Sequence, residues 1–189
     1  MARTHPGTSR TGATTKNSHA HDAVKLLMAD HREVKALFAR YKKLVTAQGS
    51  ATERQTLAET ICDMLTVHAS IEEEIFYPAA RAAMPDDALL DEAEVEHASA
   101  KDLIAQIKAM SPEDKLYDAK VTVLREYIDH HVQEEEGELF PKATKAGLDL
   151  DEIGAELRAR KEELTAEQAE GTTQSGTGAG AGSGKMAGH

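Results

Sequence analysis

The sequence predicts an all-α protein, an antiparallel up-down-up-down four-helix bundle with an extra C-terminal helix and disordered tails. Apolar residues recur every three or four positions through the central part of the 189-residue chain, which is the period of an amphipathic helix. Glycine is scarce there, with only four glycines between Thr14 and Glu170, whereas a β-rich domain needs turn signals about every 8–12 positions. No apolar run approaches the roughly 18 residues that span a bilayer, so the helices are expected to pack on one another.

The two ends of the chain differ in composition from the middle. Residues 1–18 hold three basic residues and no acids, and residues 171–189 are mostly Gly, Ala, Ser and Thr. Neither segment can bury enough apolar surface to offset the entropy lost on ordering. We therefore expect a disordered N-terminal arm at 1–18 and a disordered tail at 171–189. Between them we expect a four-helix bundle at 19–147 and an acidic helix at 148–170.

Local signals mark the ends of the first two helices. The first helix runs from about 19 to 47 and ends before Gly49. Ser50 followed by Glu53 forms a capping box, which predicts the start of the second helix. Pro85 marks the break after the second helix and the start of the third.

The later elements are predicted in the same way. The segment Ser111-Pro112-Glu113-Asp114 opens the fourth helix, because proline suits the first position of a helix, and Gly147 ends it. The stretch from 149 to 170 is weakly amphipathic and carries eight acids and three bases. We expect this stretch to pack on the outside of the bundle or to fray.

One ionisable layer crosses the predicted bundle. Each of the four apolar seams is interrupted by a single histidine, and two of the seams add a glutamate one turn later. The six residues are His31, His68, Glu72, His97, His131 and Glu135. A spacing of four places histidine and glutamate on one face of a helix. The number of residues between each histidine and the neighbouring interhelical connection places the four histidines at similar heights along the bundle. For the third connection this holds only if its centre lies near Asp114, which predicts a looser connection around 110–117.

The residue types in this layer indicate metal binding. A lone histidine on an apolar face is usually a core residue, but four at one height together with two glutamates are not explained in that way. An unpaired buried carboxylate costs several kcal/mol or takes up a proton, and a cation removes this penalty. Imidazole and carboxylate together suit iron, manganese or zinc better than calcium or magnesium. Six side chains suit two metal ions bridged by carboxylates, and the single cysteine, Cys62, excludes an intrachain disulfide and an iron–sulfur cluster.

The motifs around this layer make the resemblance specific. They are Asp30-His31-Arg-Glu33, His68-x-x-x-Glu72 leading to Ile75-Phe76-Tyr77-Pro78, Glu96-His97, and His131-x-x-x-Glu135 leading to Glu138-Leu139-Phe140-Pro141. Over about 19–147 the chain resembles the hemerythrin-like family, the HHE cation-binding domains. The resemblance implies a four-helix bundle with a non-haem di-iron centre near one end, its two irons oxo- or hydroxo-bridged. It implies that the four histidines are terminal ligands and that Glu72 and Glu135 bridge the irons, with manganese and zinc as alternative metals.

The chain departs from the oxygen-carrying hemerythrins at two positions. Those proteins have a second histidine one turn after the third-helix histidine, where this chain has Lys101. Their last motif has an aspartate five residues after histidine, where this chain has Glu135 after four. One nitrogen ligand is therefore missing, and the candidates to replace it, besides water or hydroxide, are Glu73, Glu134, Glu136, Tyr41 and Tyr127. A more open site favours reaction with peroxide, oxygen or nitric oxide over reversible oxygen carriage.

Three functional hypotheses follow. The first is a di-iron protein that reacts with or senses small oxidants, with a catalase-like or peroxide-consuming activity as the enzyme reaction. The second is a metal-dependent regulatory or interaction protein, or an iron-holding protein without turnover. The third is a metal-free structural bundle. The net charge of −11 argues against binding to nucleic acid or an anionic membrane. No secretory signal is visible, so we expect a cytoplasmic location. Besides a small diatomic ligand or peroxide, we expect at most a protein partner that the sequence does not identify.

Overall fold

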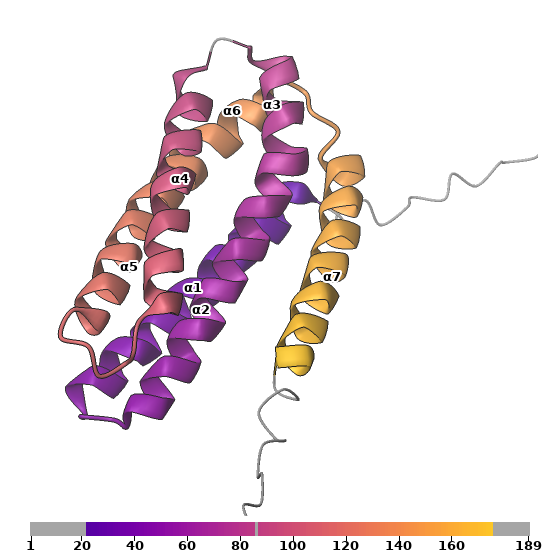
Figure 1. Cartoon of the computed structure of the whole chain (residues 1–189). Helices are drawn as coiled ribbons and strands as arrows, with labels where there is room; N and C mark the ends of the chain where they lie inside the picture. The colour runs from indigo at the N-terminus through magenta and orange to yellow at the C-terminus, as the bar shows by residue number, and fades with distance from the viewer. Residues whose placement is uncertain (1–21, 86, 176–189) are drawn as a thin grey trace, which may run out of the picture.

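The computed structural model of the chain describes residues 22–85 and 87–175, which form helices joined by short connections, without a strand (Figure 1). The elements are α1 (Ala23–Thr46), α2 (Ala51–Ile71), the π-helical turn η1 (Glu72–Phe76), α3 (Tyr77–Ala83), α4 (Ala88–Ala109), α5 (Tyr117–Glu134), the π-helical turn η2 (Glu135–Leu139), α6 (Phe140–Lys145) and α7 (Leu150–Ser175). The predicted all-α class is confirmed. The predicted disordered segments lie outside the described residues, except that 171–175 continue α7.

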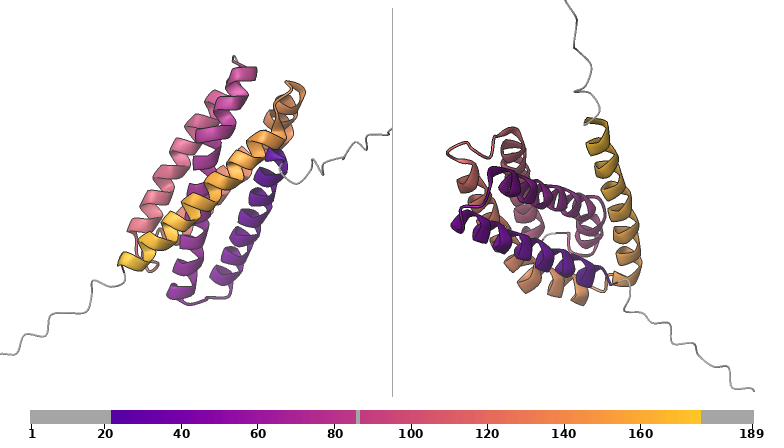
Figure 2. Two further views of the ribbon diagram at one scale, coloured as in Figure 1. Left: turned by 90° about the vertical axis from the view of Figure 1, so that its right-hand side faces the viewer. Right: turned by 90° about the horizontal axis from the view of Figure 1, so that it is seen from below.

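Four helical columns surround a common core. The columns are α1, α2 with η1 and α3, α4, and α5 with η2 and α6, and successive columns run in opposite directions (Figure 1). The fourth column packs against the first, so the columns enclose one interior, as the end-on view in Figure 2 shows. The last helix, α7, lies outside the four columns along α1 and α2. In the described ranges, none of the helices combines the length and the apolar character needed to cross a membrane.

The predicted breaks near Gly49 and Pro85 hold, but α1 begins at Ala23, capped by Asp22, rather than at about 19. Ser50 and Glu53 form the expected capping box. The fourth long helix, α5, begins at Tyr117, so the predicted start at Ser111 was wrong. The Ser111 backbone N–H donates to the Asp114 carboxylate at 2.9 Å, and such a local turn competes with helix formation. The looser connection expected around 110–117 is observed.

The core consists of two apolar clusters with the ionisable layer between them. The lower cluster includes Val34, Phe38, Ile61, Ile104, Leu124 and Ile128, and the upper cluster includes Leu27, Phe76, Leu90, Phe140 and Leu157. The layer is therefore central in the bundle, whereas the resemblance implies a centre near one end. Tyr127, one of the candidate ligands predicted from the sequence, is 49% exposed and does not lie on the buried face of α5. Val121, Leu124 and Ile128 form the buried face there instead.

A candidate metal centre

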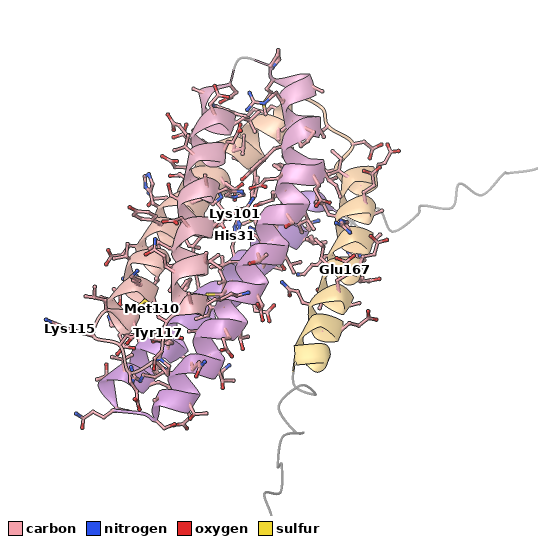
Figure 3. All side chains as sticks on the ribbon, viewed as in Figure 1. His31, Lys101, Met110, Lys115, Tyr117 and Glu167 are labelled. Atoms are coloured by element: carbon pink, nitrogen blue, oxygen red, sulfur yellow. The ribbon has the colours of Figure 1, made fainter. Side chains whose placement is uncertain are left out.

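The structure brings all six predicted residues together inside the bundle. The six are His31, His68, Glu72, His97, His131 and Glu135, and all are buried. Figure 3 shows His31 about midway along the bundle. His31 and His68 form a first pair with Nε2 atoms 3.1 Å apart, and His97 and His131 form a second pair with the same separation. The cluster therefore has two halves, each with two imidazole nitrogens that face one another.

The two glutamates connect the halves. Glu72 Oε2 lies 3.2 Å from Nε2 of His68, in the first pair, and 3.5 Å from Nε2 of His97, in the second. Glu135 Oε2 lies 3.2 Å from the other imidazole of the first pair and 3.4 Å from the other imidazole of the second. Each carboxylate thus contacts one histidine of each pair, which is the arrangement needed to bridge two ions.

An acid lies beside the outer nitrogen of each histidine; three of these contacts are hydrogen bonds, whereas Asp30 and His68 Nδ1 are in ion-pair range without a hydrogen bond. The outer pairs, with their Nδ1–oxygen distances, are His31–Glu136 (2.9 Å), His97–Glu73 (2.9 Å), His131–Glu96 (2.7 Å) and His68–Asp30 (3.5 Å). An ionised carboxylate only accepts hydrogen bonds, so the proton of a neutral imidazole lies on Nδ1. The Nε2 lone pair is then free and directed into the cluster, as metal-binding histidines require.

These outer acids were not predicted in this role from the sequence. Glu73 and Glu136 were candidate inner ligands, but both contact outer nitrogens. A signal for them was present in the chain, because each outer acid is the immediate neighbour of an inner residue: Asp30 of His31, Glu73 of Glu72, Glu96 of His97 and Glu136 of Glu135. Each acid serves a histidine on a different helical column, which only the packed bundle shows.

The inner polar atoms fit a pair of metal ions. Both carboxylate oxygens of Glu72 and Oε2 of Glu135 are buried without a hydrogen-bond donor. Two nitrogens that bind one ion at about 2.1 Å and at right angles are about 3.0 Å apart, close to the 3.1 Å separation within each pair. Imidazole and carboxylate donors suit a first-row transition metal. The donor set and the orphaned oxygens therefore agree with a dinuclear site.

The electrostatics of the cluster without metal explain how it tolerates two carboxyl groups. Burial raises the pKa of Glu72 well above its usual value, and the neighbouring Glu135 raises it further. Burial also opposes ionisation of Glu135, but the imidazoles of His131 and His31 lower its pKa to about 2. Burial thus favours the protonated form of Glu72, whereas the imidazoles favour the ionised form of Glu135. A metal ion binds an ionised carboxylate, so metal binding at Glu72 would be coupled to proton release.

Two π-helical turns shape the upper side of the cluster. Each begins at an inner glutamate, and the N–H groups of Tyr77 and Phe140 donate to the carbonyls of Glu72 and Glu135, five residues earlier. In a regular α-helix a residue five positions on is rotated by about 140° from the first. The wider turn brings Tyr77 and Phe140 back toward the cluster. A proline follows each of them, and its missing N–H interrupts the regular helical hydrogen bonding next to this π turn.

The two halves of the cluster are not equivalent. The Tyr77 hydroxyl donates to Glu135 Oε1 at 2.9 Å and lies 3.2 Å from His97 Nε2, in the second pair. At the corresponding position Phe140 stacks on the His31 ring, in the first pair, with centroids 5.9 Å apart. Burial and the charges of nearby glutamates raise the pKa of Tyr77 well above its usual value, so the phenol keeps its proton. Among the residues that the structure describes, the second half alone therefore carries a hydroxyl donor.

The other candidates for the missing ligand do not reach the cluster. Tyr41 donates to Asp118 at 2.6 Å, and Tyr127 is half-exposed. Glu134 contacts the exposed His130. Lys101, at the position of the missing histidine, pairs with Glu73 at the rim. Among the residues weighed from the sequence none fills the gap, and Tyr77, which was not weighed, is the side chain that does reach the inner nitrogens.

A small cavity adjoins the four histidines on the side of the lower cluster. Its volume is about 20 Å³, which is room for roughly one water-sized molecule. Apolar side chains line most of it, namely Val34, Ala100, Ile104, Ile128 and Val132. The space beside the inner nitrogens is therefore small and mostly apolar, on the scale of a single water-sized molecule.

The outer helix α7 is tied to the first half of the cluster. Lys161 forms an ion pair with the buried carboxylate of Asp30 at 2.5 Å, and Asp30 lies beside His68. The adjacent Arg160 pairs with Glu74 at the surface. The predicted position of this helix, on the outside of the bundle, is observed, and its one lysine, Lys161, reaches an outer acid.

Replacing Lys161 with alanine should destabilise the protein by about 2 kcal/mol, because the buried Asp30 carboxylate loses its cation. Arg160→Ala, on the neighbouring residue, is the matched control and should leave the unfolding free energy nearly unchanged, since exposed ion pairs contribute little. Urea denaturation of the two variants measures the difference. Equal effects would contradict the assignment of Lys161 to a buried contact.

Known proteins are similar to this chain in sequence and in fold. A model of the Hemerythrin HHE cation binding domain family matches residues 22–143. The uncharacterized protein Rv2633c of Mycobacterium tuberculosis is 26% identical over 146 residues, which cover 76% of this chain and 87% of that protein. A protein from Nostoc sp. named DNA nickase is 30% identical over 131 residues, which cover 68% of this chain. This chain spans only about a third of the length of the nickase, since the match covers 34% of it.

A solved structure supports the same fold. The HHE domain-containing homolog of Rv2633c from Mycobacterium kansasii aligns with a TM-score of 0.65 and 22% identity, over 77% of this chain and 88% of that one. The family match covers more than half of the chain, including all six inner residues. The chain therefore belongs to the hemerythrin HHE cation-binding domain family.

Proposed function

We propose that this protein is a dinuclear non-haem iron protein that reacts with hydrogen peroxide. The observation that carries the proposal is the pair of imidazole pairs joined by two carboxylates, beside a cavity that holds one small molecule. Two iron ions bound there would supply open coordination positions and exchange electrons with the substrate. Peroxide disproportionation gives one oxygen and two waters from two peroxides, so it requires no external reductant. Oxygen and nitric oxide are the alternative small ligands.

The chain's own residues have distinct tasks in this proposal. His31 and His68 would hold one ion, and His97 and His131 the other. The outer acids keep each Nε2 lone pair directed inward. The apolar cavity limits substrate size. Tyr77 is placed to donate a hydrogen bond or a proton to a molecule beside the second pair.

Oxygen evolution from peroxide by the iron-loaded protein tests the proposal. The expected result is about one oxygen per two peroxides consumed, followed with an oxygen electrode and by absorbance. The zinc-loaded protein is the control, because zinc has no redox chemistry and should be inactive. An iron-loaded protein that neither releases oxygen nor changes its spectrum would overturn the proposed reaction.

Tyr77→Phe is expected to slow peroxide consumption by about 10- to 100-fold, because it removes the only hydroxyl donor found beside the inner nitrogens in the described residues. The iron content should stay at the wild-type level, since the six proposed ligands remain. Tyr127→Phe, on a half-exposed tyrosine, is the matched control and should leave the rate unchanged. Wild-type rates in the Tyr77 variant would show that the phenol has no part in turnover.

The contact between α7 and the cluster favours a second candidate function, a metal-dependent regulatory protein. Lys161 contacts Asp30, and Asp30 contacts His68, a proposed ligand. Metal binding that orders His68 would stabilise this contact and the position of α7. Limited proteolysis with and without iron measures this effect. Cleavage of α7 at the same rate in both states would remove support for the regulatory function.

A further inference from the structure

A third group of ligand-type side chains lies on the surface beside the buried cluster. It comprises Glu96 on α4 with His130 and Glu134 on α5, whose ligand atoms all lie within 4.8 Å of one another. His130 Nε2 is 3.6 Å from Glu96 Oε1 and 3.4 Å from Glu134 Oε1. We propose that these three side chains form a second metal site, which binds one divalent transition-metal ion at the protein surface.

The sequence of α5 repeats the ligand spacing of the buried cluster. His130 and Glu134 are four residues apart, as are His131 and Glu135, and the two motifs are offset by one residue. The nitrogen–oxygen distance is 3.4 Å in both. One residue turns an α-helix by about 100°, so the second motif presents the same donors on an outer face. The surface pair therefore reproduces the geometry of a proposed buried ligand pair.

Glu96 completes the surface group and is held in position from within. Its Oε2 accepts a hydrogen bond from His131 Nδ1 at 2.7 Å, while its Oε1 faces His130. The Glu96 carboxylate thus contacts both the buried cluster and the surface group, and its hydrogen bond to His131 fixes its orientation. A preorganised ligand loses less conformational freedom when it binds an ion than a freely rotating side chain does.

The exposure of the group suits an ion that arrives from solvent. The side chains of His130, Glu134 and Glu96 are 64%, 30% and 24% exposed. Three protein ligands leave positions for water, and a donor set of one imidazole and two carboxylates suits zinc, manganese or ferrous iron. The contacts of His130 with Glu96 and Glu134 would also arise in an ion pair between a protonated His130 and these two acids. Metal binding distinguishes the two cases, because it requires the neutral imidazole.

Zinc binding to the full chain tests the proposal, with zinc ion itself as the probe. Wild type and His130→Ala are dialysed against zinc at pH about 8, where an ordinary histidine is neutral, and the zinc per chain is measured. The expected result is one zinc fewer in the variant, or an affinity for that ion lowered by at least about 10-fold. Glu134→Gln should give the same loss. Because His130 is exposed, its replacement should leave the melting temperature unchanged.

Imidazoles elsewhere in the chain provide the matched control. His19 and His21 are two histidines outside the described residues that also have the chemistry to bind zinc. Replacing both with alanine should leave the surface zinc in place. Equal zinc content in wild type and His130→Ala would overturn the proposal, whereas loss of the buried ions alone, in variants of Glu72, would not affect it. The result therefore does not depend on the proposed function.

Discussion

Replacing Glu72 with glutamine is expected to lower the affinity for metal by about 100-fold or more, while the metal-free protein keeps its stability to within about 1 kcal/mol. Glu72 contacts both histidine pairs, so its amide isostere removes a charged bridging ligand. The metal-free fold should tolerate the change because burial raises the pKa of Glu72 and so favours its neutral form. Metal content per chain and urea denaturation measure the two effects.

Glu135→Gln provides the counterpart with an opposite effect on the metal-free fold. It should lose metal to the same extent, but the metal-free protein should lose about 1–3 kcal/mol, because an ionised carboxylate buried among imidazoles is replaced by a neutral group. The sign follows from the pKa of about 2, which is below that of an ordinary glutamate, so the charged form stabilises the fold at neutral pH. If both variants kept their metal, Glu72 and Glu135 would not be metal ligands, and the cluster of buried side chains would have a structural role only.

Removal of metal from the wild-type protein is expected to lower its melting temperature by about 10 °C. A ligand present at about 1,000 times its dissociation constant stabilises the native state by about 4 kcal/mol, and each kcal/mol shifts a domain of this size by about 2–4 °C. The physical cause is the release of buried oxygens of Glu72 and Glu135 that have no hydrogen-bond donor. Calorimetry before and after treatment with a chelator measures the shift.

The Glu72→Gln variant is the control for this experiment, because its melting temperature should respond little to added metal or chelator. Restoring iron to the stripped wild type should recover the original value. A wild-type melting temperature that is indifferent to metal would favour the metal-free structural bundle and would also remove the basis for regulation through α7.

The sequence alone predicted the helices and the six inner residues, because both depend on local periodicity. A helix turns by a constant angle per residue, so spacing determines which side chains share a face and which connections bring the faces to one height. The same reasoning failed at Tyr127 on α5, which was a candidate ligand but is half-exposed, whereas Leu124 on that helix is buried. Two neighbouring stripes of that helix carry apolar residues, and only packing decides which of them is buried.

The sequence by itself thus determined the all-helical class, the six clustered residues and the chemistry of their donors. The tertiary structure decided which acid holds which histidine, since those pairs join different helical columns and have no local pattern. It also decided the position of Tyr77, because the π turn that carries it toward the cluster departs from the α-helical angle on which sequence reasoning depends. Properties set by rotation along one helix can be read from spacing, whereas contacts between helices exist only once the columns have packed.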